Sequence, residues 1–365
     1  MRVNYNDLVN IYEKEIRVNT KNKKKIYNFE RFKIEYLNEI YYALNNNLYK
    51  DMKYNIFMIK DPKYRIVMSL NIKDKIINHY VTRFILMPKL EKYFDMRNVA
   101  TRKNKGRDYG INLVKKYLEH FKTKDSCYVL KIDMSKYFYS IDHSVLKEMI
   151  KKDLDSYEYE IISSIIDSTN YSYINYKIIS LKEKEIKYNS IRKKEIEEIP
   201  LYKFGKGLPI GNMSSQFLSI FYLNRIDHKI VHDYHLKYMV RYMDDIVIFH
   251  EDKEYLKKIK MLLEEELLNT YKLKINKKKT NIMSIKEGVV FCGYRFRIID
   301  KKTVINVCKS TRERVKKRVK EVKYLYINNK ISLDKAFFSI NTYYNGFKYG
   351  SRLNIKRIVD KYFFG

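Results

Sequence analysis

Three aspartates lie at the ends of short apolar runs, where a carboxylate is unusual. Asp133 ends the run VLKID, and Asp244 and Asp245 lie together inside RYMDDIVIF. A carboxylate among Met, Ile and Val resists ionisation unless a cation compensates its charge. An isolated Asp-Asp pair is commonly an ordinary hairpin turn. Apolar flanks on both sides instead favour a tight turn that projects both carboxylates toward a bound cation.

Three carboxylates at neighbouring strand ends have a specific chemical use. They can hold two Mg²⁺ ions about 3.5–4 Å apart, and Mg²⁺ prefers oxygen ligands while keeping substrate phosphates in its shell. One ion of such a pair activates a primer 3′-hydroxyl, and the other steadies the triphosphate and the leaving group. The three aspartates therefore predict a two-metal site, which Mn²⁺ could also occupy.

The elements that must position these carboxylates alternate between helical and extended patterns. Residues from about 6 to 50 carry apolar residues near a 3.6-residue period, which predicts helices. Two β-rich runs, NIFMI and RIVMSL, flank a turn around Pro62 and predict a hairpin with a basic tip. From Lys73 to Phe121 the pattern is helical again, interrupted by TRKNKGRDYG, and a strand CYVLKIDM follows.

The second half of the chain continues this alternation. Residues 169–206 are rich in Lys, Ile and Tyr with weak periodicity, and we interpret them as a surface insertion or an extended hairpin. A Gly-rich turn, GKGLPIGN, leads into a helix from Ser214 to about His235. Two strands should meet at the Asp244–Asp245 pair, followed by a helix, a short hairpin ending in GVVFCGYRF, and about sixty mostly helical residues.

Composition limits the classes of partner. The 365 residues are 45% hydrophobic, which is enough for a sizeable core, and 75 Lys and Arg against 43 Asp and Glu give a net charge of +32. Such a surplus favours a polyanion, most simply nucleic acid. No segment approaches the ~20 apolar residues of a membrane span, and the N-terminus has no signal-peptide pattern. Three unpaired cysteines fit a reducing cytoplasm better than a disulfide framework or zinc site.

These motifs resemble those of the reverse transcriptase family. Tyr242 to Asp245 resembles the family's YxDD box in its YMDD form, and Asp133 matches the first catalytic aspartate. The resemblance implies that Asp133, Asp244, Asp245 and the backbone carbonyl of Met134 hold the metal ions. It also implies that Phe138 excludes a ribose 2′-hydroxyl, although a plain core aromatic is compatible. SIDH, which ends at His143, resembles the segment that follows this site in bacterial members.

The resemblance continues along most of the chain. The hairpin IKDPKYRIV resembles the fingers segment that contacts the incoming triphosphate, with Lys60 and Arg65 the first candidates and Lys63 next. LKINKKKTNIM matches a palm motif in which Lys279 is a candidate proton donor to pyrophosphate, against the alternative of a solvated turn. The later hairpin, GVVFCGYRF, resembles the family's primer grip. The resemblance implies that its central residues contact the primer: Phe291, Cys292, Gly293 and Tyr294.

The resemblance implies an α+β right-hand polymerase. The fingers would occupy residues 1–125, with N-terminal helices and the basic hairpin. The palm would occupy 126–298, as an antiparallel sheet backed by helices, with interleaved fingers elements and the Lys-rich insertion at about 169–206. A helical thumb would occupy 299–365. Substrates would be an RNA template, a DNA or RNA primer and dNTPs.

The segment GLPIGNMSSQ is the most discriminating. Related enzymes usually have PQGxxxSP here, whereas this chain has Ile210 for the Gln and Gln216 for the Pro. This IGxxxSQ form resembles the error-prone enzymes of diversity-generating retroelements, which work with a small basic accessory protein. A Gln packs under the new base pair and hydrogen-bonds, and Ile cannot, so geometric checking could loosen. The backbone N–H of Gly211 could still approach the nucleotide.

Three alternatives stay open at the level of sequence. A standalone bacterial reverse transcriptase of phage defence, or a retron, shares parts of the pattern. An RNA-dependent RNA polymerase would share the palm chemistry, but Phe138 opposes it because that class needs space for the 2′-hydroxyl. A non-catalytic basic RNA-binding protein would suit the charge and the 36 tyrosines, but the three intact aspartates oppose it.

Overall fold

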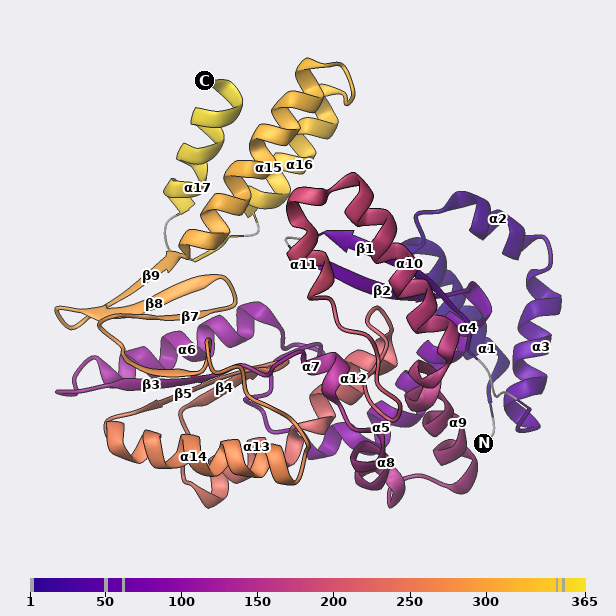
Figure 1. The fold of residues 1–365 in the computed structure, drawn as a ribbon, viewed down its shortest axis with the longest axis horizontal. Coiled ribbons are helices and arrows are strands. Elements are labelled where there is room, and N and C mark those ends of the chain that lie inside the picture. Colours follow the sequence, from indigo (N-terminus) through magenta and orange to yellow (C-terminus); the bar gives the residue numbers. More distant parts are fainter. Residues whose placement is uncertain (1–2, 49–51, 61–62, 346, 350–351) are drawn as a thin grey trace. The chain divides into compact units, whose positions relative to one another are not determined.

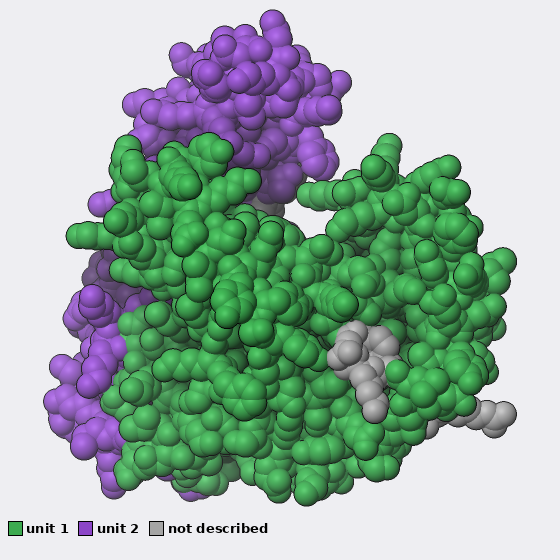
Figure 2. Space-filling view, turned by 45° about the vertical axis from the view of Figure 1, so that its right-hand side comes forward, with its two compact units in different colours: residues 1–101, 134–233, 262–276 green, residues 102–133, 234–261, 277–365 purple. Residues whose placement is uncertain are grey.

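The computed structural model describes residues 3–48, 52–60, 63–345, 347–349 and 352–365. Two compact units, coloured in Figure 2, are each assembled from segments far apart in the sequence. Unit 1 contains residues 1–101, 134–233 and 262–276, and unit 2 contains residues 102–133, 234–261 and 277–365. The chain passes repeatedly between the two, so the proposed division at residues 125 and 298 stays a prediction.

Unit 2 is built on a four-stranded antiparallel sheet of order β4-β5-β3-β6 (Figure 1). Apolar residues make these strands: Val129, Leu130 and Ile132 are at most 1% exposed, and residues 246–249 are fully buried. Helix α6 packs on the sheet, and its Tyr117 hydroxyl donates to the Met239 carbonyl at 2.9 Å. The strands are β3 (Tyr128–Ile132), β4 (Met239–Tyr242), β5 (Asp245–His250) and β6 (Asn281–Ser284).

A second antiparallel sheet in unit 2 has the order β7-β8-β9, and three helices follow it. Its strands are β7 (Val289–Phe291), β8 (Tyr294–Ile299) and β9 (Lys302–Val307). The helices of this unit are α6 (Arg107–Phe121), α15 (Lys309–Ile327), α16 (Leu333–Asn345) and α17 (Arg352–Val359), the last followed by a π-turn (Asp360–Phe364). The helical C-terminal segment expected from the sequence is confirmed.

Unit 1 is mainly helical and carries one hairpin, β1 (Tyr54–Lys60) with β2 (Tyr64–Leu70). The expected turn residue Pro62 lies outside the described residues. The N-terminal helices are α1 (Tyr5–Ile11) with a π-turn (Tyr12–Arg17), α2 (Lys23–Glu30), α3 (Lys33–Asn45), α4 (Ile72–Tyr80) with a π-turn (Val81–Leu86), α5 (Met87–Leu90) and a 3₁₀ turn (Glu91–Tyr93).

The middle segment of unit 1 is also helical. Its helices are α7 (Tyr137–Ser140), α8 (His143–Lys151), α9 (Ser156–Asp167) with a 3₁₀ turn (Ser168–Asn170), α10 (Ser172–Tyr188) with a 3₁₀ turn (Ser190–Arg192), α11 (Lys193–Glu197), α12 (Met213–Tyr222) and α13 (Asn224–His228) with a π-turn (Lys229–Asp233). Helix α14 (Lys253–Asn269) begins in unit 2 and ends in unit 1. The expectation of an extended hairpin within 169–206 is wrong, because α10 and α11 occupy this segment.

The α+β class predicted from the sequence is confirmed, with antiparallel sheets and a majority of helices. No helix among the described residues is long and apolar enough to cross a membrane. The three cysteines are free thiols. His228 and His232 stack with ring centroids 5.6 Å apart, and His235 has a φ of 51°.

Candidate active site

The three aspartates of the sequence prediction lie in unit 2 at one end of the β3–β5 pair. The ladder between β3 and β5 ends at Ile132 and Ile246, so Asp133 and Asp245 follow at the next opposed position. Asp244 lies in the turn between β4 and β5, directly before Asp245. Two adjacent central strands of one sheet therefore deliver the carboxylates, as the apolar flanks predicted.

The β4–β5 turn is tight and strained. Tyr242 pairs with Asp245, which leaves Met243 and Asp244 as the two turn residues, and Met243 has a φ of 58°. A non-glycine residue with positive φ costs about 1–3 kcal/mol and persists only where its surroundings enforce it. Arg241 helps to enforce this conformation. Its fully buried side chain donates from Nη1 to the Met243 carbonyl at 2.8 Å.

Two lysines provide cationic partners for the aspartates. Lys279 Nζ lies 3.0 and 2.9 Å from the two carboxylate oxygens of Asp133. Lys131 Nζ lies 3.0 Å from Asp245 Oδ2 and donates to the Val290 carbonyl at 2.6 Å. The structure places Lys279, a candidate from the sequence, beside Asp133, and its role as a proton donor stays a prediction; Lys131 was not predicted. The two ammonium groups supply positive charge to carboxylates that would otherwise face one another.

Burial sets the protonation behaviour of the acid pair. Desolvation raises the pKa of the Asp245 carboxyl to about 6, although Lys131 acts to lower this pKa, and Asp244 and Asp133 act to raise it. Desolvation also raises the pKa of Asp244, supported by the charge of Asp133 and opposed by Lys279. Carboxylates held in this way gain much from a further cation.

The donor set fits a hard divalent cation in its chemistry. Asp245 Oδ1 is buried and has no hydrogen-bond partner, although such an atom usually has one. Within the described residues, no group of three or more His, Cys, Asp and Glu side chains is arranged to hold a metal by itself. Both oxygens of Asp133 contact Lys279, and one oxygen of Asp245 contacts Lys131. Met134 is buried and forms a β-bridge with Ile275.

The predicted primer-grip residues form the β7–β8 hairpin of unit 2. Phe291 pairs with Tyr294, and the two turn residues, Cys292 and Gly293, have φ values of 47° and 85°. A two-residue turn with positive φ at both positions matches the right-handed twist of its strands. Burial, together with nearby Asp245, raises the pKa of the Cys292 thiol to about 12, so this thiol stays protonated. The Val290 carbonyl that accepts from Lys131 belongs to the same hairpin.

The predicted nucleotide-contacting residues lie in unit 1, around the loop that precedes α12. The loop is fastened by its backbone: Leu208 N donates to the Phe138 carbonyl at 2.7 Å, and Met68 N donates to the Ile210 carbonyl at 2.8 Å. Phe138 and Ile210 are both partly exposed. The structure therefore brings these two residues onto one short loop system between α7 and β2.

Gly211 shows why this loop needs a glycine. Its φ is 119°, and a Cβ built on it would lie 3.0 Å from Val67 Cγ1 and 3.3 Å from the Met68 carbonyl oxygen. Both the backbone conformation and the limited space disfavour a side chain at this position. Gln216 is exposed on α12. The start of this helix is held by Asn78, whose side chain exchanges hydrogen bonds with Ser214 at 2.7 and 3.2 Å.

The basic residues of the β1–β2 hairpin are exposed. Lys60 and Tyr64 form the last pair of the ladder, and the Lys60 ammonium lies 5.4 Å from the Tyr64 ring centroid. Lys63 follows in the connecting turn, and Arg65 pairs with Ile59 in the ladder. These positions fit the expected hairpin tip, apart from the two residues of the tip that are outside the described part.

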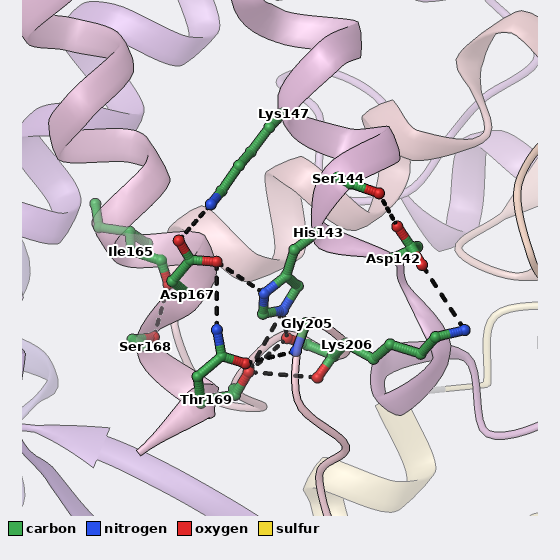
Figure 3. Close-up of polar contacts among 12 residues, drawn as sticks. Asp142, His143, Ser144, Lys147, Ile165, Asp167, Ser168, Thr169, Gly205 and Lys206 are labelled. Atoms are coloured by element: carbon green, nitrogen blue, oxygen red, sulfur yellow. Dashed lines mark hydrogen bonds and ion pairs between the residues drawn. The ribbon is translucent and has the colours of Figure 1, made fainter.

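The SIDH segment contributes a buried histidine to the same loop system (Figure 3). His143 is 3% exposed, and its Nδ1 lies 3.0 Å from Asp167 Oδ1 while its Nε2 lies 2.7 Å from the Gly207 carbonyl. Thr169 also donates to the Gly207 carbonyl, at 2.9 Å. Lys147 forms an ion pair with the other oxygen of Asp167. The imidazole thus joins α8, the end of α9 and the Gly207 backbone.

Sequence reasoning missed Lys131 and Arg241, and a signal for each was available. Lys131 precedes Asp133 by two positions in a strand, so both side chains are on one face. Arg241 lies in an otherwise apolar run two residues before the turn, and a fully buried arginine requires acceptors nearby.

The family model described as reverse transcriptase (RNA-dependent DNA polymerase) matches residues 58–328. The chain belongs to the reverse transcriptase family. No curated protein matches the sequence.

Two solved structures of apo telomerase from Candida tropicalis are similar to this chain. The one truncated from its C-terminal domain has a TM-score of 0.47 and 15% identity, over 69% of this chain and 55% of that chain. The other has a TM-score of 0.46 and 18% identity, over 91% of this chain and 61% of that chain. This reverse transcriptase thus spans less than two thirds of the telomerase chains that it matches.

Proposed function

We propose that this reverse transcriptase is an active RNA-directed DNA polymerase. The observation that carries the proposal is the meeting of Asp133, Asp244 and Asp245 at adjacent strand ends, with the buried, unpartnered Oδ1 of Asp245 among them. The reaction is attack of a primer 3′-hydroxyl on the α-phosphate of a dNTP, which releases pyrophosphate.

The residues of unit 2 supply positioning and charge for this reaction. Asp133, Asp244 and Asp245, with the backbone carbonyl of Met134, would hold two Mg²⁺ ions, which supply Lewis-acid activation of the hydroxyl and stabilise the leaving group. Lys279 is more than half exposed and pairs with Asp133. Its mobile ammonium can move from the carboxylate to an arriving phosphate and donate a proton to the leaving pyrophosphate.

The residues of unit 1 select the nucleotide. Phe138, whose carbonyl accepts a hydrogen bond from Leu208 N, blocks a ribose 2′-hydroxyl. Three basic residues of the β1–β2 hairpin contact the triphosphate: Lys60, Lys63 and Arg65. The loop around Gly211 offers its backbone to the nucleotide because no side chain covers it. Phe138→Ala is expected to increase incorporation of rNTPs relative to dNTPs, and an unchanged ratio would remove this role from Phe138.

The decisive experiment is RNA-templated primer extension with Asp244→Asn. The variant keeps the shape of the side chain and loses its charge, so the rate should fall at least about 100-fold, while binding of a primer–template stays near the parent value. The matched control is Asp125→Asn, an exposed aspartate of the same unit. Synthesis by Asp244→Asn at the parent rate would refute the assignment.

The finer assignment is to the enzymes of diversity-generating retroelements, which misincorporate opposite template adenine. The proposal is supported by Ile210, whose backbone fastens the loop to β2 and whose partly exposed side chain has no hydrogen-bonding group. A small basic accessory protein belongs to this assignment by resemblance. Ile210→Gln is expected to lower errors opposite adenine, measured by sequencing of the cDNA. An unchanged error spectrum would remove the assignment and leave the polymerase activity untouched.

A further inference from the structure

Helix α10 of unit 1 is fixed to its surroundings mainly by one side. Ile174 and Ile178, four residues apart, are fully buried on that side. Asn175 exchanges two hydrogen bonds with the backbone of Tyr202, at 2.8 and 3.0 Å. Lys182 donates to the carbonyls of Glu197 and Ile199, both at 2.9 Å. The opposite face adds one hydrogen bond, from Tyr54 N to the Tyr173 hydroxyl at 3.1 Å, so the helix is held mainly by its buried side.

The opposite face of α10 and strand β1 form a groove. Helix α10 packs against β1 of the fingers hairpin (Figure 1), and the groove between them has a volume of about 740 Å³. The helix contributes a stripe with i, i+3, i+4, i+7 spacing, made of Tyr173, Tyr176, Lys177 and Ser180. The strand contributes Tyr54, Asn55, Ile56 and Phe57.

Three aromatic side chains of this groove are substantially exposed to solvent. Tyr176 is 73% exposed, Phe57 42% and Tyr173 39%. Tyr171, just before the helix, stacks on Tyr173 with ring centroids 6.1 Å apart and an interplanar angle of 28°. A contiguous exposed aromatic surface on a firmly held helix is typical of a binding site.

The charge of the groove indicates what binds there. Its eight lining residues include one lysine, Lys177, and no acidic residue. Further along α10, Lys184 and Lys187 lie four and seven residues beyond Ser180 and continue the stripe, with Glu183 beside them. Aromatic rings next to lysines are the combination that binds single-stranded nucleic acid, because the rings stack on bases and the ammonium groups meet phosphates.

We propose that the groove between α10 and β1 binds the single-stranded part of the RNA template, with bases stacked on Tyr173 and Tyr176 and the backbone at Lys177. This proposal rests on the proposed function, because an RNA-directed DNA polymerase is what makes the bound strand an RNA template. Residues three apart on a helix are about 4.5 Å apart along its axis. Rings at this spacing can stack on the open base faces of a single strand, whereas the bases of a duplex are already stacked on one another.

The test compares Tyr176→Ala with Tyr188→Ala. Both tyrosines lie on α10 and are 73% and 76% exposed, and Tyr188 does not line the groove. Tyr176 is preferred to Tyr173 because the Tyr173 hydroxyl accepts a hydrogen bond from Tyr54 N. Binding of a labelled single-stranded RNA, followed by fluorescence anisotropy, should weaken at least about fivefold in Tyr176→Ala and stay unchanged in Tyr188→Ala.

Lys177 provides an independent measurement. If Lys177 contacts a phosphate, Lys177→Met should make the plot of log affinity against log salt shallower by about 0.7 for a single strand. Equal binding by Tyr176→Ala and the parent, or an equal loss in Tyr188→Ala, would overturn the proposal. So would a Tyr176→Ala protein that binds RNA normally but loses self-association, since the groove would then bind protein.

Primer extension separates this proposal from the proposed function. The parent should extend a primer better on a template with a long single-stranded overhang than on one with a single-nucleotide overhang, and Tyr176→Ala should lose that advantage while extending the short template normally. A parent that extends neither template contradicts the proposed polymerase activity. If the parent and Tyr176→Ala depend on the overhang to the same extent, the proposed template binding in the groove is wrong and the proposed polymerase activity is unaffected.

Discussion

The ammonium group of Lys131 bridges Asp245 and the Val290 carbonyl, at 3.0 and 2.6 Å. One side chain of β3 thus connects an aspartate of the β4–β5 turn with the β7–β8 hairpin, for which the sequence predicts a primer-grip role. The side chains of Lys131 and Asp245 are both largely shielded from water, with exposures of 15% and 26%. The unpartnered Oδ1 of Asp245 is left for another cation because Oδ2 is already held.

Lys131→Met should lower both the stability of the protein and its extension rate, and Mg²⁺ should recover part of the lost stability. Loss of one partner leaves a buried carboxylate without compensation, which costs about 3 kcal/mol of the free energy of unfolding. Mg²⁺ can replace the lost charge, so it should raise the melting temperature more in the variant than in the parent. The extension rate should fall about tenfold or more because Asp245 is no longer oriented.

Thermal melts with and without Mg²⁺ and extension rates at saturating Mg²⁺ measure the two effects. Lys124→Met is the control, since this lysine pairs with Glu251 on the surface and such pairs contribute about 0–1 kcal/mol. An equal Mg²⁺-dependent shift in the parent and in Lys131→Met would mean that Lys131 does not hold the charge of the site.

Gly211→Ala should impair nucleotide binding more than it impairs folding. A side chain at a φ of 119° is strained by about 1–2 kcal/mol, and its Cβ would press on Val67 and the Met68 carbonyl. The loop must move away from β2, so the KM for dNTP should rise about tenfold or more while kcat changes little. Steady-state extension kinetics with limiting dNTP measure this.

Gly106→Ala separates strain from crowding. Gly106 has a similar φ of 102°, and a Cβ built there meets nothing within 4 Å. It should show the stability loss of Gly211→Ala without the change in KM. If both variants raise the KM alike, the close approach of Gly211 to β2 is not what determines the KM for dNTP.

His143→Phe should destabilise unit 1 through the loss of two polar contacts. The buried imidazole lies between Asp167 and the Gly207 carbonyl, and phenylalanine fills the space without a ring nitrogen to reach either. The Gly207 carbonyl keeps its hydrogen bond from Thr169 and Asp167 keeps its ion pair with Lys147, so the cost is that of the lost hydrogen bonds, about 0.5–1.5 kcal/mol each. Lys147→Met removes only the more exposed ion pair with Asp167 and should cost less than about 1 kcal/mol. Urea unfolding of both variants measures the difference, and equal losses would show that the Gly207 contact is unimportant.

The sequence predicted the elements that local patterning determines. The apolar flanks of Asp244 and Asp245 predicted the β4–β5 turn, and two β-rich runs predicted the β1–β2 hairpin. Helix α10 was missed because only Ile174 and Ile178 of its 17 residues are fully buried, which leaves a weak hydrophobic period.

Contacts between distant segments could not be predicted from the sequence. Lys131 meets Val290 across 159 positions, and His143 meets Gly207 across 64. No local propensity encodes such a pairing, since each depends on the register of strands and on loop paths set by the whole fold. The acids and the histidine were recognisable as types, but their partners were not.

His79 should make the stability of unit 1 depend on pH. Burial lowers the pKa of the imidazole below its usual 6.5, although Glu15, 2.8 Å away, acts to raise it. The unfolded chain therefore binds a proton more readily than the folded one, so the free energy of unfolding is highest above pH 6.5 and falls as the pH drops toward the folded pKa. Each unit of depression corresponds to about 1.4 kcal/mol. His79→Gln, which can still hydrogen-bond Glu15 but does not titrate, should lose less stability between pH 7 and pH 5 than the parent in urea unfolding. The control is His235→Gln, an exposed histidine, which should keep the parent's pH dependence, and a parent-like slope in His79→Gln would assign that dependence to other groups.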